Sequence, residues 1–192
     1  MSSPALRLIV MGVSGCGKST LAQALAEHLG LDMVDGDDLH LPASVAKMRA
    51  GIALQDADRW PWLDRIGAYL AQSCAAEHPR GRVVACSALK RVYRDRIRAQ
   101  AGALCFVFLD GDFDLIEQRL QQRVGHYMQP GLLHSQFQTL EKPQSDETDV
   151  IHLPITANVQ GMVLQALQAL QEHRHATHRP PLSTHSTPLT GP

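Results

Sequence analysis

The residues from Gly12 to Ser19 read Gly-Val-Ser-Gly-Cys-Gly-Lys-Ser and fit the pattern G-x-x-x-x-G-K-[ST] at every fixed position. Glycines allow a backbone to turn tightly enough for its N–H groups to converge on phosphate oxygens. In such a loop the lysine, here Lys18, faces the β- and γ-phosphates, and the hydroxyl group of Ser19 can bind Mg²⁺. The segment therefore predicts a binding site for a nucleoside triphosphate.

The sequence on either side of this phosphate loop agrees with that prediction. An apolar run from Leu6 to Met11 precedes the loop and is typical of a buried strand. A helical pattern of apolar residues follows at once and ends at Gly30, a residue type that commonly terminates helices. Strand, glycine-rich loop and helix in one unit are the context that the motif requires, which argues against a chance match.

Three carboxylates follow the next apolar segment, Leu31–Val34, which predicts a second strand. Asp35, Asp37 and Asp38 would lie at the carboxyl end of that strand, the edge at which open α/β sheets bind ligands. There they could hold Mg²⁺ through water and accept a proton from an attacking hydroxyl group. The same Asp-Gly-Asp-Asp sequence is also typical of a turn followed by a helix cap, so both interpretations stay open.

Two further polar segments have residue types suited to a second substrate. The segment Asp56–Leu63 brings two carboxylates, Arg59 and aromatic residues into one short loop. The segment Cys86–Lys90 follows an expected strand, and Arg94 lies one helical turn beyond Lys90. These two cations form either a solvated basic face or an anion clamp. Their place beside a phosphate loop favours the clamp, more for Lys90 than for Arg94.

A pair of arginines lies farther along the chain. Arg119 and Arg123 share a face of an expected helix that leads into the segment Gly125–Gly131. Arginines beside a flexible segment could move over the phosphates and neutralise charge in the transition state. If they were paired with acidic residues on the surface, the same arginines would contribute little.

The elements that must position these residues alternate between strands and helices. Such alternation indicates βαβ units and a parallel sheet covered by helices, which is an α/β fold. Strands are expected at residues 6–11, 31–34, 82–86, 104–109 and 150–153. Helices are expected at about residues 21–29, 43–50, 61–76, 89–100, 113–123, 132–140 and 159–172. Pro61 is placed in the first turn of its helix, where proline is tolerated.

Size and composition favour one domain at residues 1–172. Of the 192 residues, 44% are hydrophobic, which is enough for one substantial core. A formal net charge of −1 gives no global attraction for nucleic acid or for an anionic membrane. No apolar run approaches the length of a membrane span, and removal of the first strand as a signal peptide would destroy the phosphate loop. The four scattered cysteines are expected to be reduced thiols, which favours a cytoplasmic protein.

The residues from 173 to 192 differ in composition from the rest of the chain. They are rich in His, Pro, Ser and Thr and contain almost no large apolar side chains, so we expect a disordered tail. Four of the ten histidines fall in this tail. Their irregular spacing, without cysteine or carboxylate partners, favours solvation of the tail over a metal site.

Taken together, these motifs resemble the gluconokinase family, small P-loop kinases that phosphorylate D-gluconate with ATP. The resemblance covers roughly residues 8–170. The phosphate loop is shared by many families, whereas the combination of Asp35–His40, Asp56–Leu63 and Cys86–Lys90 is far more specific. Further matching positions are Lys47-Met48, Tyr93-Arg94-Asp95, Leu109–Phe113, Arg119, Arg123, Gly125-His126, Gln136-Phe137, Leu140-Glu141 and Asp146–Val150.

The resemblance implies a P-loop kinase fold similar to that of nucleoside monophosphate kinases. Its five-stranded parallel sheet would be flanked by helices and accompanied by a mobile lid at about residues 123–135. The implied reaction transfers the γ-phosphoryl group of ATP to the 6-hydroxyl group of D-gluconate, with Mg²⁺ as cofactor. The resemblance also suggests a homodimer.

The same resemblance implies roles for individual residues. Lys18, Asp37 and Arg123 would be catalytic, with Asp37 as the proton acceptor. Ser19 and Asp35 would hold the metal, Asp35 through a water molecule, and Asp38 could replace either aspartate. The nucleotide would contact Gly12, Val13, Ser14, Gly15, Cys16, Gly17, Lys18, Ser19, Thr20, Arg119 and Arg123. The acceptor would contact Asp37, His40, Lys47, Arg59, Lys90 and Arg94.

Two rival interpretations remain at this point. The first is another small-molecule kinase of the same fold, such as a shikimate or nucleoside monophosphate kinase, which would share the loop and the arginines. The second is a nucleotide-dependent switch without transfer activity. A GTPase switch would carry a guanine-reading Asn-Lys-x-Asp segment, and the sequence has none.

Overall fold

A computed structural model describes residues 5–72, 80–122 and 130–177. All five strands run parallel in one sheet, in the order β2-β3-β1-β4-β5. The strands are β1 (Leu6–Met11), β2 (Asp32–Asp35), β3 (Gly81–Ala85), β4 (Cys105–Asp110) and β5 (Val150–Pro154). The central strand β1 pairs with β3 on one side and with β4 on the other.

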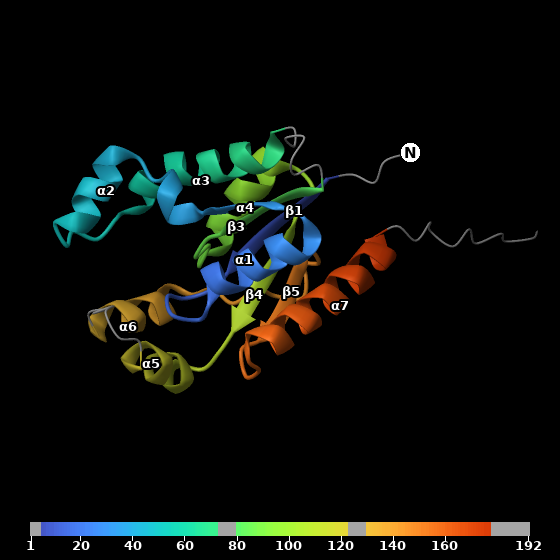
Figure 1. The fold of residues 1–192 in the computed structure, drawn as a ribbon. Helices are drawn as coiled ribbons and strands as arrows, with labels where there is room; N and C mark the ends of the chain where they lie inside the picture. The colour runs from blue at the N-terminus through green and yellow to red at the C-terminus, as the bar shows by residue number, and fades with distance from the viewer. Residues whose placement is uncertain (1–4, 73–79, 123–129, 178–192) are drawn as a thin grey trace, which may run out of the picture.

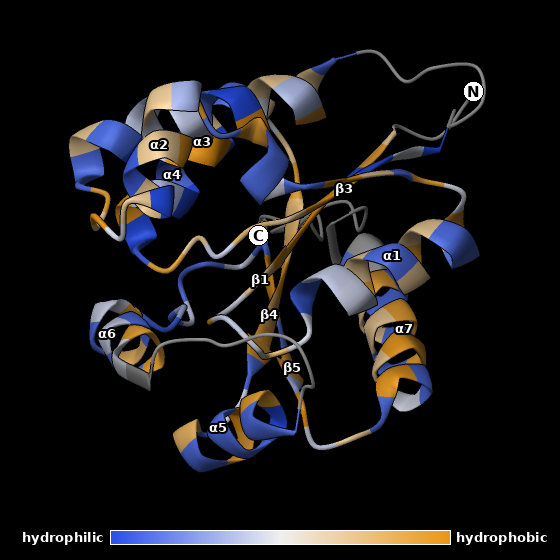
Figure 2. Ribbon diagram, turned by 60° about the vertical axis from the view of Figure 1, so that its left-hand side comes forward, coloured by the Kyte–Doolittle hydropathy of each residue, from blue (hydrophilic) through white to orange (hydrophobic). Residues whose placement is uncertain are grey.

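The sheet separates two hydrophobic cores, because successive side chains of a strand point to opposite faces. In β1, Leu8 and Val10 belong to one core and Ile9 and Met11 to the other, and all four are fully buried. Such burial on both faces explains the uninterrupted apolar sequence of the strand. In Figure 2 the inner strands β1 and β4 are mostly orange, whereas the helices around them carry blue residues.

Helices cover both faces of the sheet (Figure 1). The core that contains Leu8 and Val10 lies beneath α1 (Lys18–Leu29) and α7 (Val159–Thr177). The core that contains Ile9 and Met11 lies beneath α3 (Asp56–Ala71) and α4 (Arg91–Ala101). These α/β layers match the fold class that the alternation of elements predicts.

The strand register brings the candidate site residues to one edge of the sheet. Val10 of β1 pairs with Ala85 of β3 and with Val107 of β4, and Asp35 of β2 also pairs with Ala85. The carboxyl ends of these strands therefore lie together. The elements at this edge are the 3₁₀ helix η1 (Gly36–Leu39), α2 (Pro42–Arg49), α5 (Phe113–Gln121) and α6 (Pro130–Thr139), of which the three α-helices are on the left in Figure 1.

Helix α3 differs from the expectation that Asp56–Leu63 forms a loop. The helix begins at Asp56, and Pro61 lies in its interior, not in its first turn. The backbone N–H of Gln55 donates to Asp58 at 3.0 Å, and the acidic residues of the first turn suit the positive end of a helix. This capping starts the helix earlier than the proline alone would predict.

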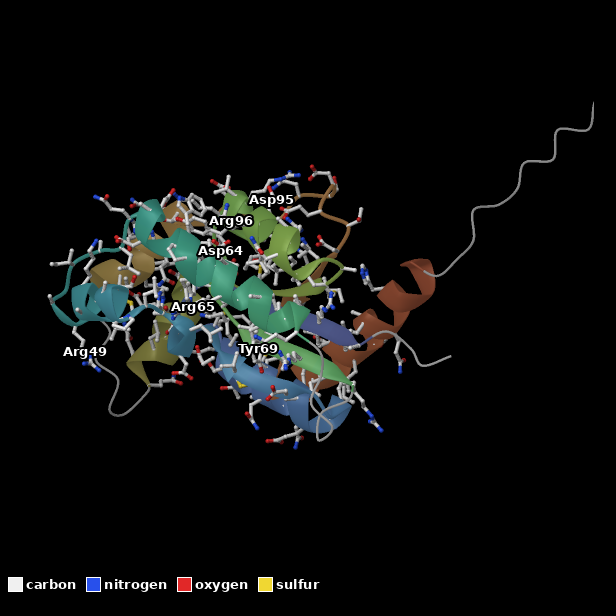
Figure 3. The ribbon with its side chains drawn as sticks, turned by 90° about the horizontal axis from the view of Figure 1, so that it is seen from above. Arg49, Asp64, Arg65, Tyr69, Asp95 and Arg96 are labelled. Carbon is white, nitrogen blue, oxygen red and sulfur yellow. The ribbon has the colours of Figure 1, made fainter. Side chains whose placement is uncertain are left out.

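Helices α3 and α4 lie side by side, as Figure 3 shows from above. Asp64 of α3 accepts two hydrogen bonds from Arg96 of α4, at 2.6 and 2.8 Å. Tyr69, farther along α3, donates to Asp32 of β2 at 2.7 Å. These contacts fix α3 against its neighbouring helix α4 and against β2, the outermost strand on that side of the sheet.

Some boundary predictions lie partly or wholly outside the described residues. Helix α7 continues to Thr177, beyond the expected domain boundary at residue 172, and residues 178–192 are outside. Residues 130–135 of the expected lid form the start of α6, and residues 123–129 are outside. Cys16, Cys86 and Cys105 are buried free thiols, as predicted, whereas Cys74 is outside. In the part that is described, no helix has the length and apolarity needed to cross a membrane.

Candidate active site

The phosphate loop leaves β1 at Gly12 and enters α1 at Lys18. Three of its glycines have positive φ angles, 144° at Gly12, 82° at Gly15 and 102° at Gly17. Side chains rarely adopt these conformations, so the loop requires glycine there. At Gly15 a side chain would also collide with Leu120 of α5, whose Cγ lies 2.6 Å from the position of an added Cβ.

Several groups of the loop are arranged to receive an anion. Within the described part of the chain, the N–H groups of Gly15 and Gly17 have no hydrogen-bond acceptor. The ammonium group of Lys18 donates to the carbonyl of Val13 at 3.0 Å, so it is held over the loop. Cys16 is buried, and burial raises the pKa of its thiol. Its side chain therefore packs in the hydrophobic core, while its backbone forms part of the phosphate loop.

The side chains of Ser19 and Asp35 meet where α1 begins and β2 ends. The hydroxyl of Ser19 donates to Oδ2 of Asp35 at 2.6 Å. The other carboxylate oxygen of Asp35 accepts from the N–H of Asp37 at 3.1 Å and so caps η1. Both interpretations of the Asp-Gly-Asp-Asp sequence therefore hold for Asp35, which is a helix cap and a carboxylate beside the phosphate loop.

The oxygen atoms of Ser19 and Asp35 are suited to a magnesium ion. They are too few for a metal ion that is coordinated by protein side chains alone. Among the described residues, no group of three or more His, Cys, Asp or Glu side chains could hold a metal. Mg²⁺ commonly takes one or two protein oxygens and completes its shell with water and substrate phosphates. Ser19 and Asp35, next to a phosphate loop, supply that kind of partial site.

Asp37 extends from η1 next to this pair, and its side chain is 88% exposed. Its pKa is raised, first because neighbouring protein displaces part of the water near the carboxylate and second because Asp35 is negatively charged. A carboxylate with a raised pKa is a stronger base, provided that it stays ionised. Asp38 is also exposed, and its carboxylate makes no hydrogen bond or ion pair with another described residue.

His40 lies behind Asp37 and stacks on Trp62 of α3, with ring centroids 4.3 Å apart and planes 12° apart. Trp62 in turn donates from Nε1 to the carbonyl of Gly36 at 2.6 Å. Nε2 of His40 is 4.0 Å from Oδ1 of Asp37, and burial lowers the pKa of His40. Its imidazole is therefore neutral at neutral pH. Its other nitrogen, Nδ1, is buried and has no partner among the described residues.

Two lysines near the start of α3 are each paired with an aspartate of its first turn. Lys47 of α2 donates to Asp58 at 2.6 Å. Lys90, after β3, lies 2.9 Å from Asp56, which also accepts from the hydroxyl of Tyr93 at 2.6 Å. These hydrogen bonds, from Tyr93 first and then from Lys90, lower the pKa of Asp56, and the bond from Lys47 lowers that of Asp58.

Arg59 belongs to the same group of side chains. It donates to the carbonyl of Leu54 at 2.7 Å and lies 3.6 Å from a carboxylate oxygen of Asp56. The structure thus brings together four of the residues expected to contact the acceptor. They are His40, Lys47, Arg59 and Lys90, all around the N-terminal half of α3.

Arg94 is also expected to contact the acceptor, but the structure does not place it with this group. Its side chain is 1% exposed and pairs with Glu147 through two nitrogens, at 2.6 and 2.7 Å. Its third nitrogen donates to the backbone carbonyls of Ala88, Leu89 and Glu141. All three nitrogens are thus engaged within the protein, because a partner distant in the sequence holds the side chain in the interior.

The two arginines near the expected lid have different outcomes. Arg119 of α5 donates to the carbonyl of Ile155, after β5, at 2.5 Å. Its charge also acts to lower the pKa of Cys16, against the larger effect of burial, so it lies close to the phosphate loop. Arg123 is outside the described residues, and its role stays a prediction.

Three residues at the site have no role in the sequence analysis. Trp62 and Tyr93 support His40 and Asp56, and Gln136 of α6 accepts from the N–H of Ser14 at 2.6 Å. All three occur in segments that resemble the family, and that was their only signal. Their contacts join residues distant in the sequence, so spacing alone does not reveal them.

Comparison with known proteins identifies the family. Residues 8–142 match a family described as an AAA domain. Over 169 residues the chain is 42% identical to the thermosensitive gluconokinase of Escherichia coli (strain K12), covering 86% of this chain and 89% of that protein. The chain belongs to the gluconokinase family. It is also 48% identical over 140 residues to the gluconokinase of Gluconobacter oxydans (strain 621H), covering 73% of this chain and 78% of the relative.

Solved structures agree with this assignment to the gluconokinase family. A gluconokinase from Sinorhizobium meliloti 1021 superposes with a TM-score of 0.79 and 40% identity, covering 92% of this chain and 98% of that one. The shikimate kinase from Aquifex aeolicus superposes with a TM-score of 0.56 and 14% identity, over 91% and 100% of the two chains, a likeness that shows the fold alone. The predicted P-loop kinase fold, with its five-stranded parallel sheet flanked by helices, is confirmed.

Proposed function

We propose that this protein is a gluconokinase that transfers the γ-phosphoryl group of ATP to the 6-hydroxyl group of D-gluconate. The single observation that carries the proposal is the juxtaposition of Ser19, Asp35 and Asp37 beside the phosphate loop, in a chain 42% identical to a gluconokinase. A phosphate loop binds the donor, and an adjacent carboxylate suits the activation of an acceptor hydroxyl group.

The donor side of the reaction uses the phosphate loop. The free N–H groups of Gly15 and Gly17, with Lys18 and the first turn of α1 including Thr20, bind the phosphates. Ser19 and Asp35 would hold Mg²⁺, Asp35 through a water molecule. When bound, this ion offsets the negative charge of the phosphate groups.

Asp37 acts as the proton acceptor. The oxygen of the acceptor hydroxyl group forms a bond to the γ-phosphorus, the bond from that phosphorus to the bridging oxygen of ADP breaks, and the hydroxyl proton passes to Asp37. The raised pKa of Asp37 favours this transfer. His40, neutral and fixed by its stack on Trp62, faces the same carboxylate.

The acceptor carboxylate binds among the cations around α3. Lys47, Arg59 and Lys90 present positive charge there, and a planar guanidinium such as that of Arg59 suits a carboxylate. Each of these cations has an aspartate partner of α3, so the anion binds by replacing or sharing such a partner. Arg119 and Arg123 neutralise charge on the transferring phosphoryl group.

Release of ADP from ATP and Mg²⁺ by the purified protein tests the proposal. D-gluconate, shikimate, nucleoside monophosphates and no acceptor are compared in parallel, with Lys18→Ala as the inactive control. Turnover with gluconate alone supports the proposal. Turnover with another acceptor retains the kinase and rejects the substrate, and tight ATP binding without any transfer favours a nucleotide-dependent switch.

Two further parts of the proposal concern the state of the protein in the cell. The family resemblance suggests a homodimer, which analytical ultracentrifugation tests directly. The buried free thiols Cys16, Cys86 and Cys105 support a cytoplasmic location, where cysteines are kept reduced. Fractionation of cells that express the full chain tests this location.

A further inference from the structure

The side chain of Gln136 makes two hydrogen bonds to a single residue of the phosphate loop. Its Oε1 accepts from the backbone N–H of Ser14 at 2.6 Å, and its Nε2 donates to the hydroxyl of Ser14 at 3.0 Å. The two residues are separated by 122 positions in the sequence. A side chain with one acceptor and one donor thus matches both the backbone and the side chain of Ser14.

This contact involves a different N–H group from those that face the ligand. The N–H of Ser14 is taken by protein, whereas those of Gly15 and Gly17 have no acceptor in the described part of the chain. We propose that Gln136 is a positioning residue that holds the phosphate loop in its binding conformation before the nucleotide arrives. The pair formed by Gln136 and Ser14 is called the clasp below.

The helix that carries Gln136 is anchored independently of the loop. Leu133 of α6 is 3% exposed and lies in the core, and Phe137 contacts the ring of Phe113 edge-on at 5.3 Å. At the end of α6, the N–H of Glu141 donates to the carbonyl of Leu89 at 2.9 Å. Because α6 has its own anchors on two sides, Gln136 can fix the loop instead of following it.

Preorganisation of this kind changes affinity without any contact to the ligand. A loop rich in glycine has many accessible conformations, and a nucleotide that binds a mobile loop must offset the entropy lost on ordering it. The clasp removes part of that cost in advance. It acts on the loop as a whole, so it strengthens binding of ADP and ATP by the same factor.

Nucleotide affinity of clasp variants tests the inference. Gln136→Met keeps the length of the side chain but has no donor and only a weak acceptor. We expect the Kd for ADP and for a non-hydrolysable ATP analogue, each with Mg²⁺, to rise by about tenfold, as the loss of one or two hydrogen bonds implies. Gln138→Ala, on the same helix but exposed and bonded only within α6, is the matched control and retains wild-type affinity.

A double variant separates the clasp from a general loss of structure. Ser14→Ala removes one of the two bonds and raises Kd less than Gln136→Met. If the clasp acts through Ser14, adding Ser14→Ala to Gln136→Met causes no further loss, whereas additive losses would overturn the inference. An unchanged or a lower Kd for Gln136→Met would also overturn it, and a lower value would mean that Gln136 occupies a phosphate position.

The inference rests on the nucleotide-binding part of the proposed function, so calorimetric titrations are made without any acceptor. If the wild-type protein binds nucleotide but does not phosphorylate gluconate, gluconate is ruled out as the substrate. The comparison of nucleotide affinity among the variants then still tests the clasp. A wild-type protein that binds no nucleotide would overturn both. If Gln136→Met fails to fold in a thermal melt, Ser14→Ala decides: an affinity equal to wild type rejects the clasp, and a reduced affinity supports it.

Discussion

Arg94 and Glu147 form a double-hydrogen-bonded ion pair inside the protein, and each side chain is only 1% exposed. The bonds run from Nε of Arg94 to Oε2 of Glu147 at 2.7 Å and from Nη2 to Oε1 at 2.6 Å. Arg98 donates to the same carboxylate at 2.8 Å. The pair ties α4 to the segment that leads into β5. Arg94 also donates to the carbonyls of Ala88 and Leu89, so the same side chain supports the segment that follows β3.

We expect removal of the negative charge from this ion pair to destabilise the fold. Glu147→Gln leaves Arg94 buried without a counter-charge, which typically costs about 3–5 kcal/mol. For a chain of this length, each kcal/mol lowers Tm by roughly 2–4 °C. Thermal unfolding measured by circular dichroism checks the prediction.

The neighbouring Asp146 offers a matched control for this variant. It pairs with Arg91 at 2.8 Å but is 60% exposed, so Asp146→Asn should leave Tm almost unchanged. Equal stability of the two variants would show that the buried pair has no special importance. If Glu147→Gln leaves Tm unchanged but raises KM for gluconate, the result would indicate that Arg94 contacts the acceptor after all.

The pH dependence of stability should carry the signature of the same carboxylate. Hydrogen bonds from Arg94 in the first place, with those from Arg98, lower the pKa of Glu147 from 4.5 to about 2. A group whose pKa is lower in the folded state contributes full stability above its unfolded pKa and loses it as the pH falls toward the folded pKa. The stability difference between wild type and Glu147→Gln should therefore be largest above pH 4.5 and shrink toward pH 2. Urea unfolding across this range measures it, and a difference that does not vary with pH would contradict the assignment.

Substitution of Asp37 should remove the base while leaving the nucleotide site intact. We expect Asp37→Asn to lower kcat by about 10²- to 10⁴-fold, the usual contribution of a general base. Affinity for ATP should stay near wild type, because the loop and Ser19 are unchanged. Steady-state kinetics with gluconate checks kcat, and calorimetry checks binding.

Asp38→Asn is the control for Asp37, since the two exposed carboxylates are adjacent. It should retain most of the activity. The reverse result, with Asp38→Asn inactive and Asp37→Asn active, would assign the proton acceptor to Asp38. In the wild type, kcat should decline as the pH falls through the raised pKa of Asp37, because protonation removes the acceptor.

Lys47 should matter for the acceptor and not for the donor. Loss of a charge-assisted hydrogen bond to a carboxylate typically raises KM by about 10- to 100-fold. We therefore expect Lys47→Ala to raise KM for gluconate, with KM for ATP little changed. Arg49→Ala is the matched control, because Arg49 is an exposed cation at the end of the same helix and projects outward in Figure 3. Equal effects of the two variants on KM would indicate a diffuse charge effect and reject a specific contact.

The parts of the site that local sequence predicts are those built from contiguous residues. The phosphate loop, its strand and its helix follow from the pattern at Gly12–Ser19, and the sheet edge follows from the alternation of elements. Asp35 is predicted beside the loop because strand β2 must end there. In each case the conformation depends on neighbours in the sequence or on the general geometry of a parallel sheet.

The parts that the sequence does not predict depend on distant partners. Arg94 has the spacing of an anion clamp with Lys90, but Glu147, which lies 53 positions away, takes its guanidinium into the interior. The early start of α3 depends on capping by Asp58, which outweighs the expectation from Pro61. Gln136 has no local signal at all, since its contact to Ser14 spans most of the domain.

The cations on the acceptor side of the site are already matched by acidic residues of α3, Lys47 by Asp58 and Lys90 by Asp56. The electric fields of two opposite charges in contact largely cancel at longer range. The residual field is screened within about 8 Å at physiological ionic strength. Arg59 shares Asp56 with Lys90, so the three cations exceed the two aspartates by a single positive charge. An approaching anion therefore meets only a weak steering field and arrives mainly by ordinary diffusion. Its rate of capture should depend little on added salt, so the choice among anions is made after the encounter, by the contacts formed within the site.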